Sequence, residues 1–126
     1  MRRLFWIFFL LLPASITAQN NLSQYNWYFG TSAEGIKFNI SDDQPNAVDD
    51  QNPNIGRGGS AVATDHVSGD LLFYTDGVRV IDGSHRQMPN GIGLNGDVNR
   101  NQASAICPVP GSNDQFYIFS NNGNIF

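Results

Sequence analysis

Two short loops alternate acidic and amide side chains at a spacing that suits a calcium ion. Calcium takes six to eight hard oxygen ligands, often from alternate positions of a tight loop. Both loops lack the Gly that such a loop needs at its sixth position, where Ile55 and Gln102 stand. Asp and Asn are also ordinary turn residues, so solvated turns are the alternative interpretation. The candidate ligands are Asp50, Asn52 and Asn54 in the first loop, and Asp97, Asn99 and Asn101 in the second.

The sequence patterns that could indicate a catalytic site are weaker than the calcium pattern. His66 and His85 are the only imidazoles, whereas a zinc site needs three or four ligands. Ser60 follows a glycine-rich stretch but lacks the G-x-S-x-G spacing of a hydrolase nucleophile. A glycoside hydrolase needs two facing carboxylates, and the candidates, which all stand in predicted turns, are Asp65, Asp70, Asp76 and Asp82. We therefore predict no catalytic site within this chain and no bound cofactor other than calcium.

These side chains are positioned by short strands. The apolar runs are brief and rich in β-branched and aromatic residues, and no apolar pattern of helical period lasts three turns. Polar, glycine-rich connections are expected at residues 42–59 and 88–94. The predicted strands are residues 27–29, 35–40, 60–64, 71–75, 78–81, 104–109 and 116–120.

A loose internal repeat indicates how the strands are organised. Residues 60–77 contain a hairpin that reappears at residues 104–123, with Ser60 matching Ser104 and Phe73 matching Ile118. A period of about 45 residues built from short strands is typical of a β-propeller blade. Blades cannot bury their faces alone, so two of them are not a complete propeller. The predicted fold is all-β, with antiparallel hairpins in a partial propeller-like arrangement, and a small β-sandwich is the alternative.

Alternation along the strands predicts which side chains are buried. Trp27 and Phe29 share one strand face and are expected in the core, which leaves Tyr28 partly exposed or packed on a neighbouring blade. Cys107 stands alone on an apolar strand, so no disulfide framework is expected. We expect its thiol to be buried as a small apolar group.

The first residues and the charge suggest a location. Arg2 and Arg3 precede an apolar run at residues 4–12, and small residues follow before Gln19, so residues 1–18 are predicted to be a signal peptide. Residues 19–126 would then be an exported domain with no membrane span after cleavage. The net charge of −4 and the scattered basic residues argue against nucleic acid as a partner.

Several of these pieces together resemble a known group of proteins. They are W-Y-F-G at residues 27–30, L-L-F-Y-T-D-G at 71–77, M-P-N-G at 88–91 and the hairpin at 104–120. The set is similar to the amino-terminal region of large exported surface proteins of gliding and related Bacteroidetes bacteria. That resemblance implies a propeller-like region at the cell surface, export by the type IX secretion system, and further domains downstream.

The sequence therefore favours an exported, non-enzymatic binding or adhesion module that presents loops to a glycan or protein ligand at the cell surface or outside the cell. Two alternatives remain. The chain is the amino-terminal fragment of a secreted hydrolase with its catalytic residues downstream, or it is a structural spacer. Fold kinship cannot choose among them, because function resides in sites carried by a fold.

Overall fold

The computed structural model describes residues 21–31, 34–49 and 55–123, and these residues form strands and turns without a helix. The predicted signal peptide and the first loop of calcium candidates lie outside the described residues. The all-β, antiparallel prediction is confirmed. The strands are β1 (Asn26–Tyr28), β2 (Glu34–Phe38), β3 (Pro45–Asp49), β4 (Ala61–Thr64), β5 (Leu71–Thr75), β6 (Arg79–Asp82), β7 (Gln87–Ile92), β8 (Ser104–Pro108) and β9 (Phe116–Ser120).

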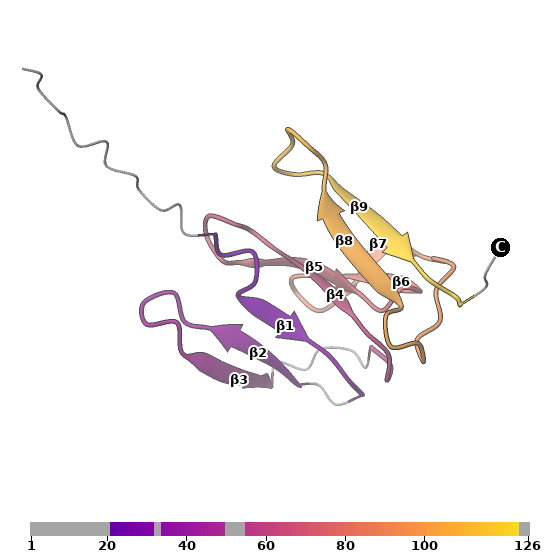
Figure 1. Cartoon of the computed structure of the whole chain (residues 1–126), viewed down its shortest axis with the longest axis horizontal. Coiled ribbons are helices and arrows are strands. Elements are labelled where there is room, and N and C mark those ends of the chain that lie inside the picture. Colours follow the sequence, from indigo (N-terminus) through magenta and orange to yellow (C-terminus); the bar gives the residue numbers. More distant parts are fainter. Residues whose placement is uncertain (1–20, 32–33, 50–54, 124–126) are drawn as a thin grey trace, which may run out of the picture.

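The strands form three consecutive sheets, shown in chain order in Figure 1. We name them sheet A (β1-β2-β3), sheet B (β4-β5-β6-β7) and sheet C (β8-β9), and every pairing within them is antiparallel. Sheet B lies between the other two in the figure. The two predicted hairpins correspond to β4-β5 and β8-β9, so both are confirmed.

The turn between β4 and β5 shows how the sequence specifies a hairpin. The Asp65 side chain accepts hydrogen bonds from the backbone N–H groups of Val67 and Ser68, both at 2.8 Å. Gly69 adopts a φ of 73°, which disfavours residues with a Cβ. The Asp at the entry and the Gly near the exit therefore close this turn in the predicted way.

The core lies between sheets A and B. Tyr28 of β1 stacks on Tyr74 of β5, with ring centroids 5.0 Å apart and planes 13° apart. Ile55 and Ile81 complete this buried cluster, while Val48, Val62 and Leu71 pack against it. Sheet C is held to sheet B by a smaller contact, in which Phe116 meets Phe73 edge to face at 5.2 Å.

Strand direction differs between the two sheet contacts. The carbonyl at the end of β1 accepts a hydrogen bond from Ser60 at the start of β4, and Leu22, before β1, donates to His66, after β4. β1 therefore runs antiparallel to β4. Ser104, at the start of β8, donates to the carbonyl of Thr75, which pairs with Ala61 at the start of β4. The last residues of the two strands, Thr64 and Pro108, also line one cleft, so β4 and β8 begin at the same end and run in the same direction.

The β2–β3 and β6–β7 turns share two features but differ in length, since the N–H of Asn39 donates to the carbonyl of Gln44 and the N–H of Asp82 donates to that of Arg86. The Asn39 side chain accepts a hydrogen bond from the N–H of Ser41, and the Asp82 side chain accepts one from the N–H of Ser84. Each turn then contains a non-glycine residue with positive φ, which is Asp43 at 55° in one and His85 at 61° in the other. In its backbone hydrogen bonds the β2–β3 turn matches the β4–β5 turn, where the N–H of Asp65 donates to the carbonyl of Asp70 and the N–H of Gly69 donates to that of Asp65.

Two regions expected as connections contain strands. β3 falls within residues 42–59, and β7 covers most of residues 88–94. Their sequences, P-N-A-V-D and Q-M-P-N-G-I, are rich in residues that strands usually avoid. Each is the last strand of its sheet, where Pro is tolerated because one side of the strand makes no ladder. Tertiary position therefore overrode local propensity in both.

The burial predicted for Trp27 and Phe29 was wrong. The alternation is real but its phase is opposite, because Tyr28 is 4% exposed while Trp27 and Phe29 are 47% and 45% exposed. The ring of Tyr28 packs on sheet B, whereas Trp27 meets Phe38 of its own sheet edge to face at 5.7 Å. Packing against sheet B decided which face of β1 is buried. The apolar pattern alone does not specify that face.

The burial predicted for Cys107 was also wrong, because this thiol is exposed. Cys107 pairs with Tyr117, and Ala105 pairs with Phe119, so these four side chains share one face of sheet C. The opposite face, with Ile106 and Ile118, packs toward sheet B. Because no described strand covers the first face, an apolar strand here buries only one of its sides.

Candidate ligand-binding cleft

A cleft of about 540 Å³ lies where ends of all three sheets meet. It is bounded by the segment before β1, by the end of β4 with its turn, and by the loop between β8 and β9. We call it the end cleft. Loops that converge at one end of a rigid β scaffold are a common location for ligand sites.

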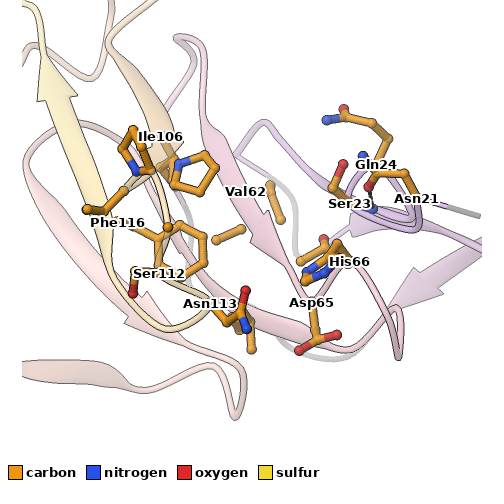
Figure 2. Close-up of a pocket in the computed structure, with 17 residues that line it drawn as sticks. Asn21, Ser23, Gln24, Val62, Asp65, His66, Ile106, Ser112, Asn113 and Phe116 are labelled. Carbon is orange, nitrogen blue, oxygen red and sulfur yellow. Dashed lines mark hydrogen bonds between the residues drawn. The ribbon is translucent and has the colours of Figure 1, made fainter. Parts of the chain in front are cut away.

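The end cleft has an apolar side and a polar side, as Figure 2 shows. Val62, Ile106 and Phe116 form the apolar side, which belongs to β4, β8 and β9. The polar side consists of Asn21, Ser23, Gln24, Asp65, His66, Ser112 and Asn113. Apolar walls with a few convergent polar groups are the usual composition of a small-ligand site.

Some of the polar side chains are available to a ligand. The side chains of Gln24, His66 and Asn113 make no hydrogen bond with other described residues, and all three are exposed. Asp65 is already engaged by its turn, and the backbone hydrogen bonds from Ser68 and Val67 lower the pKa of its carboxyl group. Amide and imidazole groups therefore supply most of the hydrogen-bonding capacity that remains.

The charge of the end cleft restricts its ligands. Asp65 is the one carboxylate among the described residues that line it, and no Lys or Arg is among them. An anionic ligand would meet a carboxylate and no cationic partner, which is unfavourable in a partly enclosed site. The lining suits a neutral ligand with several hydroxyl or amide groups and some apolar surface.

A second cleft of about 490 Å³ continues along the strands from the end cleft. The two clefts share Ser23, Gln24, Val62 and Ile106, so they form one groove. We call the second part the strand groove. It follows β1 on one side and the first halves of β4 and β8 on the other.

The calcium hypothesis stays a prediction, since only one of its two loops is described. Asp97 accepts a hydrogen bond from the N–H of Asn99 at 3.0 Å and forms an ion pair with Arg100 at 3.4 Å. These contacts lower the pKa of Asp97, the backbone hydrogen bond from Asn99 most strongly. The described residues include no cluster of three or more His, Cys, Asp or Glu side chains that could hold a metal ion.

The other residues considered for chemistry have structural contacts. The Ser60 hydroxyl donates to the carbonyl of Tyr28, and the Asp76 carboxylate pairs with Arg79 at 3.1 Å. Nδ1 of His85 lies 3.1 Å from the hydroxyl of the buried Tyr74. These side chains hold sheets and turns together, and none of them points to a catalytic pair.

Sequence reasoning missed most of the cleft. Asn21, Gln24 and Asn113 look like ordinary loop residues, and they come together only because three sheets end at one place. Asn26 was also missed. It is 2% exposed and donates to the carbonyl of Gly69 at 2.9 Å, which ties sheet A to the β4–β5 turn. A polar residue inside an apolar strand was the available signal.

Comparison of the chain with protein-family models, with curated proteins and with solved structures finds no match. Within the described ranges, no helix has the length and apolar character needed to cross a membrane. Any functional conclusion must therefore come from the cleft and from the sequence.

Proposed function

We propose that this chain is the amino-terminal part of an exported, propeller-like protein that acts as a non-enzymatic binding or adhesion module at the cell surface. Export is supported by the pattern of residues 1–18, and the surface location by the resemblance to Bacteroidetes surface proteins, which also suggests the type IX route. The end cleft carries the binding proposal. Its apolar side and its largely uncharged polar side, with Asp65 as the one charged residue among the described lining, offer recognition without a pair of carboxylates.

The propeller-like arrangement is supported by sheets B and C. Their first strands, β4 and β8, lie next to each other and run in the same direction, as the inner strands of consecutive blades do. Ser60 and Ser104, which match in the sequence repeat, each donate to the carbonyl of a residue that ends a strand of the preceding sheet. Two equivalent contacts at matching positions favour a repeated unit over an irregular sandwich.

Sheet A fits the same scheme as a blade that begins one strand late. The last residues of β1 and β5 each accept a hydrogen bond from one of the two repeat serines, and a glycine with positive φ follows two residues later in both, so β1-β2-β3 corresponds to β5-β6-β7. This correspondence also explains why β1 runs antiparallel to β4, since β5 does so as well. Within the described residues, sheet A then has no counterpart of β4.

A neutral glycan is the ligand class that best suits the end cleft. Sugars present hydroxyl groups to amide and imidazole side chains and an apolar ring face to a wall such as Ile106 and Phe116. The absence of Lys and Arg from the described lining disfavours acidic sugars. A protein ligand with an uncharged loop is the other member of the proposed class.

A panel of immobilised neutral and acidic glycans tests this proposal. The chain should bind a subset of the neutral glycans, and a Gln24→Ala/Asn113→Ala variant should lose at least about tenfold in affinity, or ~1.4 kcal/mol. Gln87→Ala is the matched control, because this exposed residue of β7 lies outside both clefts. Equal loss in the control would show that Gln24 and Asn113 do not form the site. Binding to neither glycans nor cells would remove the glycan class and favour a spacer role.

A further inference from the structure

The strand groove borders the edge of sheet A where a first strand would lie. β1 pairs with β2 on one side, and among the described residues it has no ladder partner on its other side. In sheet B the corresponding strand β5 has β4 at that place, and in sheet C β9 has β8. The inference below rests on this correspondence, and therefore on the propeller-like arrangement proposed above.

The groove has the shape and lining that a strand requires. It runs beside Asn26, Trp27 and Tyr28 of β1 and continues into the end cleft, so it follows the full length of β4. At the starts of β4 and β8 its opposite side is lined by small residues, and Val62, Gln102 and Ile106 complete that side. The small residues are Gly58, Gly59, Ser60, Ala61, Ser104 and Ala105. A backbone can approach such a surface closely, but large side chains directed toward it would not fit.

β4 in sheet B and β8 in sheet C stand at the position that a strand beside β1 would have in sheet A. Their sequences indicate which residues would suit that position. β4 and the residue before it read S-A-V-A-T, and β8 reads S-A-I-C-P. Both begin with Ser-Ala, continue with a β-branched residue, and are otherwise small and uncharged. Both run antiparallel to their partner strand.

We propose that the edge of β1 binds an extended peptide segment of the type Ser-Ala-Val/Ile-small, which adds antiparallel to β1 as the first strand of sheet A. Strand addition gives affinity through backbone hydrogen bonds and specificity through alternate side chains. The segment would extend sheet A from three strands to four, the number in sheet B. An edge without a ladder partner among the described residues would otherwise invite non-specific pairing.

A synthetic peptide with the sequence of residues 58–66, G-G-S-A-V-A-T-D-H, is the probe. Fluorescence anisotropy of the labelled peptide, titrated with the full chain, should give saturable binding. A scrambled peptide of the same composition should bind at least about tenfold more weakly, or not at all. Trp27, which is half exposed and lines the groove, should change its emission on binding. A Trp27→Phe variant should lose that signal but still bind by anisotropy.

Backbone methylation separates strand addition from other modes of binding. Successive N–H groups of a strand point to opposite sides, so two peptides methylated at alternate nitrogens test the two sides separately. One of them should lose binding and the other should keep it. Binding that is equal for both, equal for the scrambled peptide, or absent throughout would overturn the inference.

The glycan panel distinguishes this failure from failure of the proposed function. Glycan binding that depends on Gln24 and Asn113, without peptide binding, would retain the end cleft as a ligand site and remove the strand site. Peptide binding without any glycan binding would support the strand site and leave the glycan class without support.

Discussion

Tyr74 is the residue on which the core depends most. It is fully buried, its ring stacks on Tyr28, and its hydroxyl lies 3.1 Å from Nδ1 of His85. It joins sheet B to sheet A through one side chain. The pattern of the sequence shows an aromatic here but not the partner that it meets.

Replacing Tyr74 should separate packing from hydrogen bonding. Tyr74→Ala should lower the free energy of unfolding by about 3–5 kcal/mol, as expected when a large buried aromatic is removed. Tyr74→Phe keeps the ring and should cost only about 1 kcal/mol. Urea denaturation followed by circular dichroism measures both. Equal effects would mean that the hydroxyl, and not the stacked ring, is the main contribution.

Three turn aspartates should give the fold a characteristic acid sensitivity. Backbone hydrogen bonds lower the pKa of Asp65, Asp82 and Asp97, mainly from Ser68, Arg86 and Asn99 respectively. A carboxylate with a depressed pKa stabilises the fold above its ordinary value of 3.8, and that contribution is lost as pH falls through the lower, folded value.

The melting temperature should therefore be constant near neutral pH and fall as the pH drops below about 4. Asp65→Asn keeps an acceptor oxygen for the turn but no longer titrates, so its melting temperature should depend less on pH in this range. Asp114→Asn is the control, because Asp114 is an exposed aspartate outside the three turns. A decline of the same size in Asp65→Asn as in the unmodified chain would contradict this account.

At the scale of elements, close approach between loops fixes how sheets B and C join. Gly77 has a φ of 86°, and a Cβ at this position would lie 2.5 Å from the carbonyl oxygen of Ala103. Gly30 has a similar φ of 82°, but a Cβ there would meet nothing within 4 Å. The two glycines differ in their surroundings and share their backbone conformation.

This pair makes a matched test of sheet packing. Gly30→Ala should cost about 1–2 kcal/mol from backbone conformation alone. Gly77→Ala should cost more, because the loop before β8 must also move away. Thermal melting of the two variants measures the difference. Equal losses would show that the loop adjusts at no cost.

The second calcium loop lies in the same region and supports the same junction. Asp97 donates its backbone N–H to the carbonyl of Asn121, which links the loop to the end of β9. If calcium binds at Asp97, Asn99 and Asn101, millimolar calcium should raise the melting temperature by holding this junction. Identical melting curves in calcium and in EDTA would mean that Asp97 is only a turn residue paired with Arg100.

At the scale of the whole molecule, the described structure ends in an open apolar face. Tyr117 and Phe119 are 53% and 59% exposed on sheet C, beside Cys107. Between sheets A and B, and between B and C, the corresponding faces are covered. An uncovered aromatic face on a two-stranded sheet favours association.

The full chain should therefore associate as its concentration rises. A Tyr117→Thr/Phe119→Thr variant keeps residues that suit strands but removes the aromatic surface, so it should shift toward monomer in light scattering. Val67→Thr is the control, since Val67 is 71% exposed in a distant turn. Association should also slow alkylation of Cys107. If the chain stays monomeric at all concentrations and the Cys107 thiol stays fully reactive, the exposed face of sheet C does not drive association.

The sequence by itself determined the class of fold and both hairpins. Short β-branched and aromatic runs specify strands, and Asp at the entry with Gly near the exit specifies the β4–β5 turn. These signals act within a few residues, so they can be read from the sequence alone. The repeat likewise pointed to the equivalence of Ser60 and Ser104, which make similar contacts.

Only the tertiary structure decided which faces are buried and where the cleft lies. The period of two in β1 fits either phase, and contact with sheet B selected Tyr28 over Trp27. Strands β3 and β7 form against their local propensities because a neighbouring strand supplies their hydrogen bonds. The cleft brings together Gln24, His66 and Asn113 from three segments that are distant in the sequence. Long-range packing places them side by side, so no local sequence pattern predicts the cleft.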